Sequence, residues 1–205
     1  NYTKGKDNGV RTEYYSTGSI LSKSKVENSM YIGEQIGFHK NGEIESKGSF
    51  KFGKKDGVWK TFYDNGMISE EENYENGIQI GSQKDYDIDG KLMLDRLFTK
   101  TEIKKYACYD KSGVVVKEGQ AKGGDLDYTG YFPDGKTISS HLTIKDKLIE
   151  GKATIYYPNG VLKTEYNYMN SVKMGPAKFY FLNGNIEREV TVSYTHLTLP
   201  TSDLV

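Results

Sequence analysis

The chain has 205 residues, of which 36% are hydrophobic and 13% aromatic, including 17 tyrosines. Its 28 basic and 28 acidic residues cancel and no basic cluster stands out, which disfavours nucleic acid or an anionic membrane as an electrostatic partner. The single cysteine, Cys108, excludes an intramolecular disulfide and a cysteine-rich metal site, and no apolar run is long enough for a membrane-spanning helix.

A glycine recurs along the chain at intervals of 22 to 25 residues, at Gly18, Gly42, Gly66, Gly90, Gly113, Gly135, Gly160 and Gly184. Four residues before each of these turn glycines stands an aromatic residue: Tyr14, Phe38, Phe62, Tyr86, Tyr109, Tyr131, Tyr156 and Tyr180. A fixed period of this length marks a repeat protein, in which a count of stacked units replaces a count of ordinary domains.

Each unit is predicted to be a β-hairpin. In the clearest copy, residues 53–77, two stretches rich in aromatic and β-branched residues flank the turn glycine. A second glycine, here called the leading glycine, stands nine residues before the turn glycine in most units, at Gly9, Gly33, Gly57, Gly81, Gly151 and Gly175.

The type of turn follows from two prolines. Two copies of the turn read PDG, at 133–135, and PNG, at 158–160. Proline fixes φ near −65°, which suits the first corner of a type I turn and is incompatible with a two-residue type I′ turn. We therefore predict a three-residue loop, x-Asn/Asp-Gly, whose glycine has positive φ.

This loop sets the cross-strand register. The aromatic residue four before the glycine should face the residue two after it, as in Phe38–Ile44, Phe62–Ile68, Tyr86–Leu92 and Tyr180–Ile186. Continued along the strands, the alternation places Phe50, Tyr74, Phe98 and Tyr168 on the same, inner face. The opposite face should carry Tyr15, Trp59, Tyr63, Tyr128, Phe132, Tyr157 and Phe181.

The pattern weakens at three places along the chain. Residues 1–192 are expected to form one array of about eight hairpins that begins inside a repeat, so that upstream sequence is missing. Around residues 95–130 the leading glycines fail, at Lys104 and Leu126, which indicates either drift or a recognition patch with a protruding loop at 119–125. Residues 193–205 abandon the register and resemble translated sequencing-adapter read-through, so they are expected to be a non-native or disordered tail.

No catalytic or metal-binding constellation is recognisable in the sequence. The histidines, His39, His141 and His196, lie far apart and have no ligand spacing, and no nucleophile has a base beside it. Glu70, Glu71 and Glu72 lie along one strand, where alternating side chains should not converge. An enzyme, a metal site and a cofactor are therefore not expected, and the lone cysteine leaves both the cytoplasm and the cell envelope open as compartments.

The unit resembles the MORN repeat variant that occurs in tandem in bacterial proteins, including YwqK-type antitoxins of toxin–antitoxin systems. The resemblance covers the chain up to about Val192 and is closest at Gly57, Trp59, Phe62, Tyr63, Asn65, Gly66, Ile68, Tyr74, Asn76 and Gly77. Ser29, Lys147 and Ser171 depart from glycine, and the fifth and sixth units are degenerate.

The resemblance implies an all-β fold: an elongated, twisted antiparallel sheet of tandem hairpins of about 24 residues. An open meander is favoured over a closed solenoid because one hairpin per unit leaves no third strand to close a coil. The resemblance also implies a scaffold without catalytic activity, and the antitoxin type implies a toxin as protein partner, although a repeat fold does not fix its ligand.

Two function classes follow. The first is a protein-interaction module, such as an antitoxin or immunity protein, with Tyr15, Trp59, Tyr63, Tyr128, Phe132, Tyr157 and Phe181 as partner-binding candidates. The alternative is a cell-wall glycan or choline-type binding module, whose repeats are also hairpins but use several tryptophans where this chain has one. Lipid binding is disfavoured by the zero net charge.

Overall fold

A computed structural model describes residues 2–3, 6–100 and 102–192, and every regular element in these residues is a β-strand. None of them forms a helix that could cross a membrane. The predicted tail, residues 193–205, lies outside the described residues.

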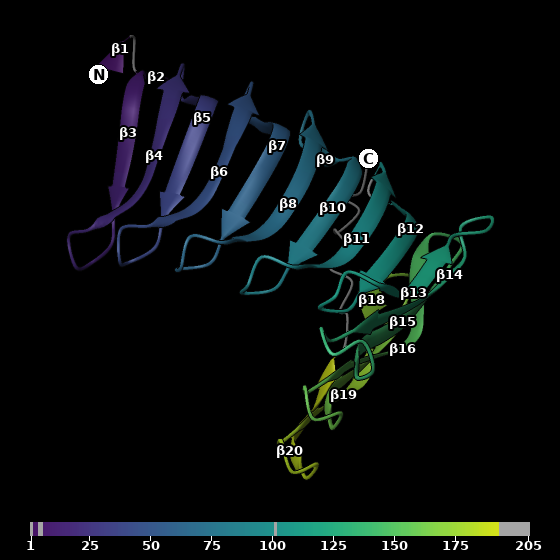
Figure 1. Ribbon diagram of the computed structural model, residues 1–205. Coiled ribbons are helices and arrows are strands. Elements are labelled where there is room, and N and C mark those ends of the chain that lie inside the picture. The colour runs from purple at the N-terminus through teal and green to yellow at the C-terminus, as the bar shows by residue number, and fades with distance from the viewer. Residues whose placement is uncertain (1, 4–5, 101, 193–205) are drawn as a thin grey trace, which may run out of the picture. The chain divides into compact units, whose positions relative to one another are not determined.

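The strands form two large antiparallel sheets and one very small one (Figure 1). The first sheet contains β3 (Gly9–Tyr14), β4 (Ile20–Glu27), β5 (Met30–Phe38), β6 (Ile44–Lys51), β7 (Lys54–Phe62), β8 (Ile68–Glu75), β9 (Ile78–Gln79), β10 (Gly81–Tyr86), β11 (Leu92–Thr99), β12 (Glu102–Tyr109) and β13 (Val115–Gln120). The second contains β14 (Leu126–Tyr131), β15 (Ile138–Lys145), β16 (Leu148–Tyr156), β17 (Leu162–Met169), β18 (Val172–Lys173), β19 (Gly175–Tyr180) and β20 (Ile186–Val192). The short strands β1 (Tyr2–Thr3) and β2 (Lys6–Asp7) pair with each other.

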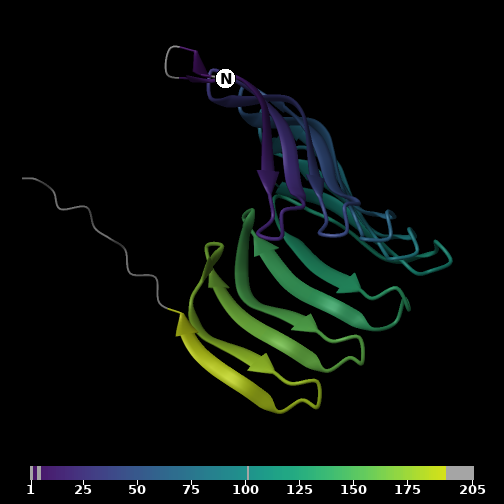
Figure 2. The same cartoon turned by 90° about the vertical axis from the view of Figure 1, so that its left-hand side faces the viewer.

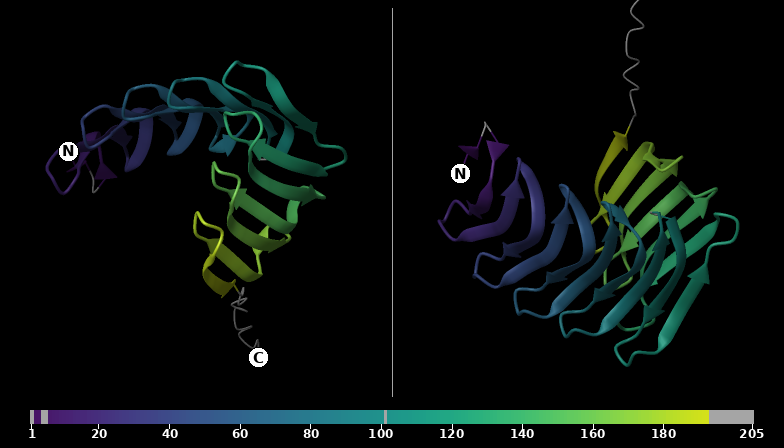
Figure 3. Two further views of the ribbon diagram at one scale, coloured as in Figure 1. Left: turned by 60° about the horizontal axis from the view of Figure 1, so that its bottom comes forward. Right: turned by 90° about the horizontal axis from the view of Figure 1, so that it is seen from above.

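Within each large sheet the strands follow chain order, so that each sheet is a meander of consecutive hairpins. Figure 2 shows this for the second sheet, coloured green to yellow, whose hairpin loops lie in a row. In Figure 3 the first and last strands of each sheet stand apart, so neither sheet closes on itself. The predicted all-β open meander is confirmed.

The repeats are divided between two compact units. One unit contains the described residues up to 121 together with 131–136, and the other contains 122–130 and the described residues from 137 onward. The change of sheet falls in the degenerate repeats. There, where a protruding loop at 119–125 was one of two alternatives, β13 runs on to Gln120 and residues 122–125 make a tight turn. Gly123 and Gly124 both have positive φ, which a two-residue turn of this kind requires.

The predicted three-residue loop is confirmed at seven of the eight turn glycines, where both closing hydrogen bonds are present, and the turn at Gly135 has the first of them, to the Phe132 carbonyl. The eight turn glycines have φ between +68° and +91°. In the turn at Gly66, the glycine N–H donates to the Tyr63 carbonyl at 2.9 Å, and the Tyr63 N–H donates to the Met67 carbonyl at 2.8 Å. The Asn65 side chain completes the loop by accepting a 2.9 Å hydrogen bond from the Met67 N–H.

The predicted cross-strand pairs are also confirmed. Phe38 lies opposite Ile44, Phe62 opposite Ile68, Tyr86 opposite Leu92 and Tyr180 opposite Ile186. We call the face that carries these pairs the pair face of each sheet.

The predicted continuation of this face is wrong. Directly after each pair the register shifts by one residue, as between Gly37 and Phe38, where Gly37 faces Ser46 and Phe38 faces Ile44. Because side chains alternate, a β-bulge of one residue moves everything beyond it to the other side. Phe50, Tyr74, Phe98 and Tyr168 therefore lie on the face opposite the pairs, which we call the ring face.

The ring face is the more buried side of the first sheet. Small and polar residues such as Ser22, Ser24 and Gln83 are buried there, together with Trp59 and Tyr106. Each of the two large rings lies over a glycine of the neighbouring strand, Trp59 over Gly48 and Tyr106 over Gly119. The pairs were expected to form the inner face, but Tyr14 is 60% exposed and Ile44 37% exposed.

Candidate binding faces

The turns are tied to one another by side chains predicted to bind a partner. Tyr15, Tyr63 and Tyr157 each begin a three-residue-loop turn, and their hydroxyls donate to the carbonyls of Phe38, Tyr86 and Tyr180 at 2.7, 2.7 and 2.9 Å. Each bond spans 23 residues and reaches the next repeat. His39 uses Nε2 in the same way, 2.8 Å from the carbonyl of Phe62. These side chains stack one repeat on the next.

The asparagines of the turns have two roles: each closes its own turn and donates a hydrogen bond to the next repeat. The Nδ2 of Asn41, Asn65 and Asn159 donates to the carbonyls of Asp64, Ile88 and Leu182, at 3.2, 3.0 and 3.2 Å, while Oδ1 closes the residue's own turn. An aspartate could close the turn but could not donate, which explains why asparagine suits this position.

Of the other four sequence-predicted candidates, Trp59 and Tyr128 are buried, at 7% exposure each. The Trp59 Nε1–H donates to the Ser49 carbonyl at 3.1 Å, and its ring meets Phe50 edge-on at 5.1 Å. Phe132 is half-buried and Phe181 is 50% exposed. The structure therefore leaves Phe181 alone among the seven predicted residues with an exposed ring.

Cations of the chain itself occupy the ring face. The Nζ of Lys55 lies 4.5 Å from the centroid of the Trp59 ring and 4.7 Å from that of Tyr74. In the second sheet Lys173 lies 3.7 Å from the Tyr166 centroid, and Arg188 lies 4.0 Å from the Phe179 centroid. These are the positions that a quaternary ammonium would take in an aromatic cage, and here the protein fills them itself.

Beside Trp59 and Tyr74 of the first sheet lies a cluster of polar side chains from β8, β10 and β11. Arg96 Nη2 is 2.5 Å from Asp85 Oδ2, and the Gln83 amide donates to Glu70. Burial, offset in part by Arg96 and reinforced by Glu70 and Glu72, raises the pKa of Asp85 to about 6. Glu70 and Glu72 thus share a face with Asp85, closer together than the sequence suggested.

Glu71 alone points to the pair face, where it lies 3.0 Å from Lys60. On the ring face, the amide of Gln83 holds Glu70 and the guanidinium of Arg96 holds Asp85. In residues 2–3, 6–100 and 102–192, no three His, Cys, Asp or Glu side chains gather closely enough to hold a metal ion.

The pair face of the first sheet carries exposed apolar side chains. Every large hydrophobic side chain that is exposed and lies on a described strand of this sheet points to that face: Val10, Tyr14, Met30, Ile44, Val58, Ile78, Leu97 and Val115. The sequence pattern does not predict this surface, because it assigns the pairs to an inner face. Val10, Val58 and Leu97 do indicate this surface in the sequence, because they are apolar residues at the alternate strand positions whose side chains point away from the ring face.

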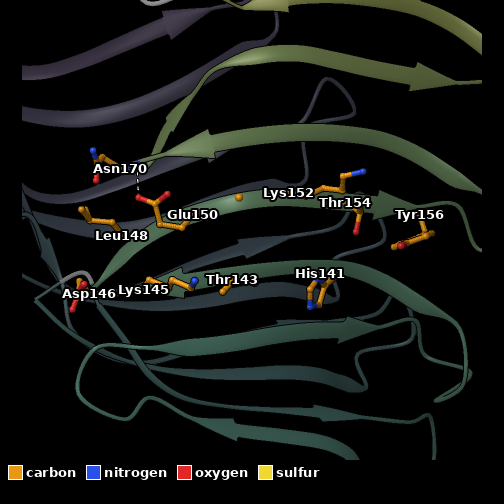
Figure 4. Close-up of a pocket in the computed structure, with 11 residues that line it drawn as sticks. His141, Thr143, Lys145, Asp146, Leu148, Glu150, Lys152, Thr154, Tyr156 and Asn170 are labelled. Atoms are coloured by element: carbon orange, nitrogen blue, oxygen red, sulfur yellow. Dashed lines mark hydrogen bonds between the residues drawn. The ribbon is translucent and has the colours of Figure 1, made fainter.

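A wide, open pocket lies on the pair face of the second sheet (Figure 4). It has a volume of about 820 Å³ and is lined mainly by polar side chains of β15 and β16. Several of these side chains already form hydrogen bonds or ion pairs within the protein. Glu150 Oε1 accepts from the Asn170 N–H at 2.7 Å, Lys152 lies 3.0 Å from Glu165, and His141 lies 2.7 Å from Asp127. The size and polar lining of the pocket suit a polar ligand.

Comparison with known proteins agrees with the repeat pattern. The family described as MORN repeat variant matches residues 7–28, 31–52, 55–76, 149–170 and 175–193. The unmatched stretch, 77–148, contains the degenerate repeats and the change of sheet. No curated protein matches the chain. Since the five matches cover more than half of its residues, the chain belongs to the MORN repeat variant family, whose members are generally non-catalytic repeat scaffolds.

Proposed function

We propose that this chain is a protein-interaction scaffold that binds its partner over the pair face of the first sheet. The proposal rests on the distribution of the exposed apolar side chains: on the strands of the first sheet they all point to the pair face. Exposed apolar side chains gathered on one face of a folded protein mark an interaction site, whereas single ones scattered over a surface need no explanation.

The composition of the face favours a protein over a small ligand. Aromatic and aliphatic pairs alternate along it with ion pairs such as Lys47–Glu34, at 2.8 Å, and Lys60–Glu71, at 3.0 Å. Apolar anchors surrounded by exposed charges are typical of protein interfaces. The face also repeats from hairpin to hairpin, so it offers an extended surface for a partner to cover.

The finer proposal is an antitoxin or immunity protein of the YwqK type, which neutralises a cognate bacterial toxin by direct binding. It is supported by the resemblance of the repeat and by a surface suited to a protein. The glycan or choline alternative gains no support from the ring face, where Lys55 and Lys173 already occupy the aromatic rings.

Affinity capture with the full chain as bait tests the scaffold proposal. A matched pair of variants gives a control: Ile44→Glu with Val58→Glu charges the pair face, while Phe52→Glu charges an exposed residue of a turn. We expect a protein to be captured by the wild-type chain and by Phe52→Glu and lost with the double variant. Recovery of cell-wall glycan without protein would overturn the proposal.

Co-expression tests the antitoxin proposal separately. A small effector encoded beside this chain should arrest growth alone, and the wild-type chain should relieve the arrest while Ile44→Glu with Val58→Glu should not. Captured proteins without toxic activity would leave the scaffold standing and reject the antitoxin role.

A further inference from the structure

A small pocket opens on the pair face of the first sheet, next to the cross-strand pair of Tyr109 and Val115. Its volume is about 280 Å³. The pocket exists because small side chains, Ser82 of β10 and Ala107 of β12, stand among larger neighbours. Ala107 forms its floor and is only 8% exposed.

Part of the pocket wall is apolar. Leu97, Tyr109 and Val115 line it, and Leu97 and Val115 remain 44% and 46% exposed. The volume lies just below the roughly 300–1,000 Å³ of small-molecule sites. A single long side chain therefore suits the space better than a cofactor.

Two carboxylates stand at opposite sides of the floor. In the strand register, Ala107 lies directly between Asp95 of β11 and Glu118 of β13, so their Cβ atoms flank its own. Ser82 Oγ donates to Asp95 Oδ1 at 2.5 Å and holds that carboxylate in place. Tyr109, Asp95 and Glu118 line the same pocket, and burial, followed by the charges of the two acids, raises the pKa of Tyr109. Lys105 also lines the pocket, so Asp95, Glu118 and Lys105 together give the pocket a net charge of −1.

We propose that this pocket anchors a basic side chain, Arg or Lys, of the protein partner. The aliphatic stem would pack on Ala107, Leu97 and Val115, and the cationic head would meet Asp95 and Glu118. Amphipathic basic side chains bury their stems in this way, and charge-assisted hydrogen bonds to carboxylates are among the stronger polar contacts. The inference deepens the proposed function, on which it rests, because it names the chemistry of the partner at one point of the same face.

NMR titration of the full chain tests the pocket without the partner. The probes are N-acetyl-arginine N-methylamide and its lysine counterpart, with N-acetyl-norleucine N-methylamide as an uncharged control of similar length. The methyl signals of Ala107, Leu97 and Val115 should shift saturably with the basic probes, with a Kd on the order of 1–10 mM. Equal shifts with norleucine, or no saturable shift, would overturn the proposal.

Variants locate the binding. Ala107→Leu fills the pocket without changing charge and should abolish the shifts. Glu118→Gln should weaken binding about fivefold or more, and Lys105→Gln should strengthen it, because a like charge is removed. Glu71→Gln, a carboxylate on the same face outside the pocket, is the matched control and should bind as wild type. If Ala107→Leu does not fold, the other two variants still test the pocket, because Glu118→Gln should weaken binding of the basic probes and Lys105→Gln should strengthen it. The same change in affinity for both variants would reject the pocket.

The two proposals fail in different ways. Basic probes that bind while no protein is captured would leave the pocket standing and remove the scaffold function. A captured partner whose affinity is unchanged by Ala107→Leu, together with silent probes, would keep the scaffold and remove the pocket.

Discussion

The hydroxyl of Tyr63 donates a hydrogen bond to the carbonyl oxygen of Tyr86, 2.7 Å away and one repeat further along the chain. Tyr15 and Tyr157 repeat this contact, so the aromatic residue that begins each of these turns joins neighbouring hairpins. In a repeat array, stability depends on such contacts between adjacent units.

Removing one of these hydroxyls should therefore destabilise the array. Tyr63→Phe leaves the half-buried carbonyl of Tyr86 without its donor and should lower the free energy of unfolding by about 1 kcal/mol in urea denaturation. Tyr14→Phe is the control: Tyr14 is 60% exposed, no hydrogen bond to its hydroxyl is seen among the described residues, and its loss should change stability by less than about 0.3 kcal/mol. Equal effects would contradict the structural role of Tyr63.

Backbone strain gives a stabilising prediction at Phe52. This residue has φ of 51° and is 72% exposed, whereas Asn28, Asn76 and Asn170 take almost the same φ at the equivalent turns of other repeats. Asparagine tolerates this region better than phenylalanine, so Phe52→Asn should raise the unfolding free energy by about 0.5–1 kcal/mol. A lower melting temperature for Phe52→Asn would show that its ring makes a contact worth more than the strain.

Substitution of a turn glycine should destabilise the protein, in contrast to Phe52→Asn. Gly66 has φ of 80°, and although no atom lies near its missing Cβ, valine is penalised there by the backbone alone. Gly66→Val should cost on the order of 1–2 kcal/mol in thermal or chemical denaturation. A neutral result would mean that the loop adopts another turn type at little cost.

The contact between Trp59 and Gly48 can be tested by fluorescence, because Trp59 is the one tryptophan in the chain. A Cβ at Gly48 would overlap the indole ring, so Gly48→Ala should displace it, shift its emission to longer wavelength and destabilise the fold by about 2–3 kcal/mol. At Gly37 the nearest atom to an added Cβ is Ser46 Oγ, which can rotate away. Gly37→Ala should leave the emission unchanged.

Asp85 predicts a pH dependence of stability. Its pKa in the folded protein is about 6, against about 3.8 when exposed, so the folded state holds this proton more tightly. Its contribution to stability is therefore largest below pH 4 and is lost as the pH rises to about 6. Relative to Asp85→Asn, the wild-type protein should lose on the order of 1–3 kcal/mol between pH 4 and pH 7. A difference independent of pH would show that Asp85 has an ordinary pKa.

The local structure of the repeat could be predicted from its sequence, but its faces could not. The prolines before Gly135 and Gly160 specified the loop, and the loop specified pairs such as Phe62–Ile68. The bulge beyond each pair has no proline or glycine of its own; it inserts Ser69 opposite the strand that carries Phe62 and so reverses the side on which Tyr74 lies.

Two of the predicted partner-binding residues also make structural contacts that the sequence pattern does not indicate. Tyr63 and Trp59 look like exposed aromatic residues in the sequence, yet one bonds to the next repeat and the other covers a glycine. Both contacts join residues of different strands, and the spacing of aromatic residues along one strand carries no information about them.

We expect the protein partner to lie on the pair face of the first sheet, and calorimetric titration of the captured partner against three variants tests this position. Ile44→Glu with Val58→Glu should weaken the Kd by roughly 100-fold or more, as expected for loss of central apolar anchors. Phe52→Glu, on a turn, and Tyr74→Ala, on the ring face, should each bind within about threefold of wild type. A double variant that binds like wild type while Tyr74→Ala abolishes binding would place the partner on the ring face and contradict the account.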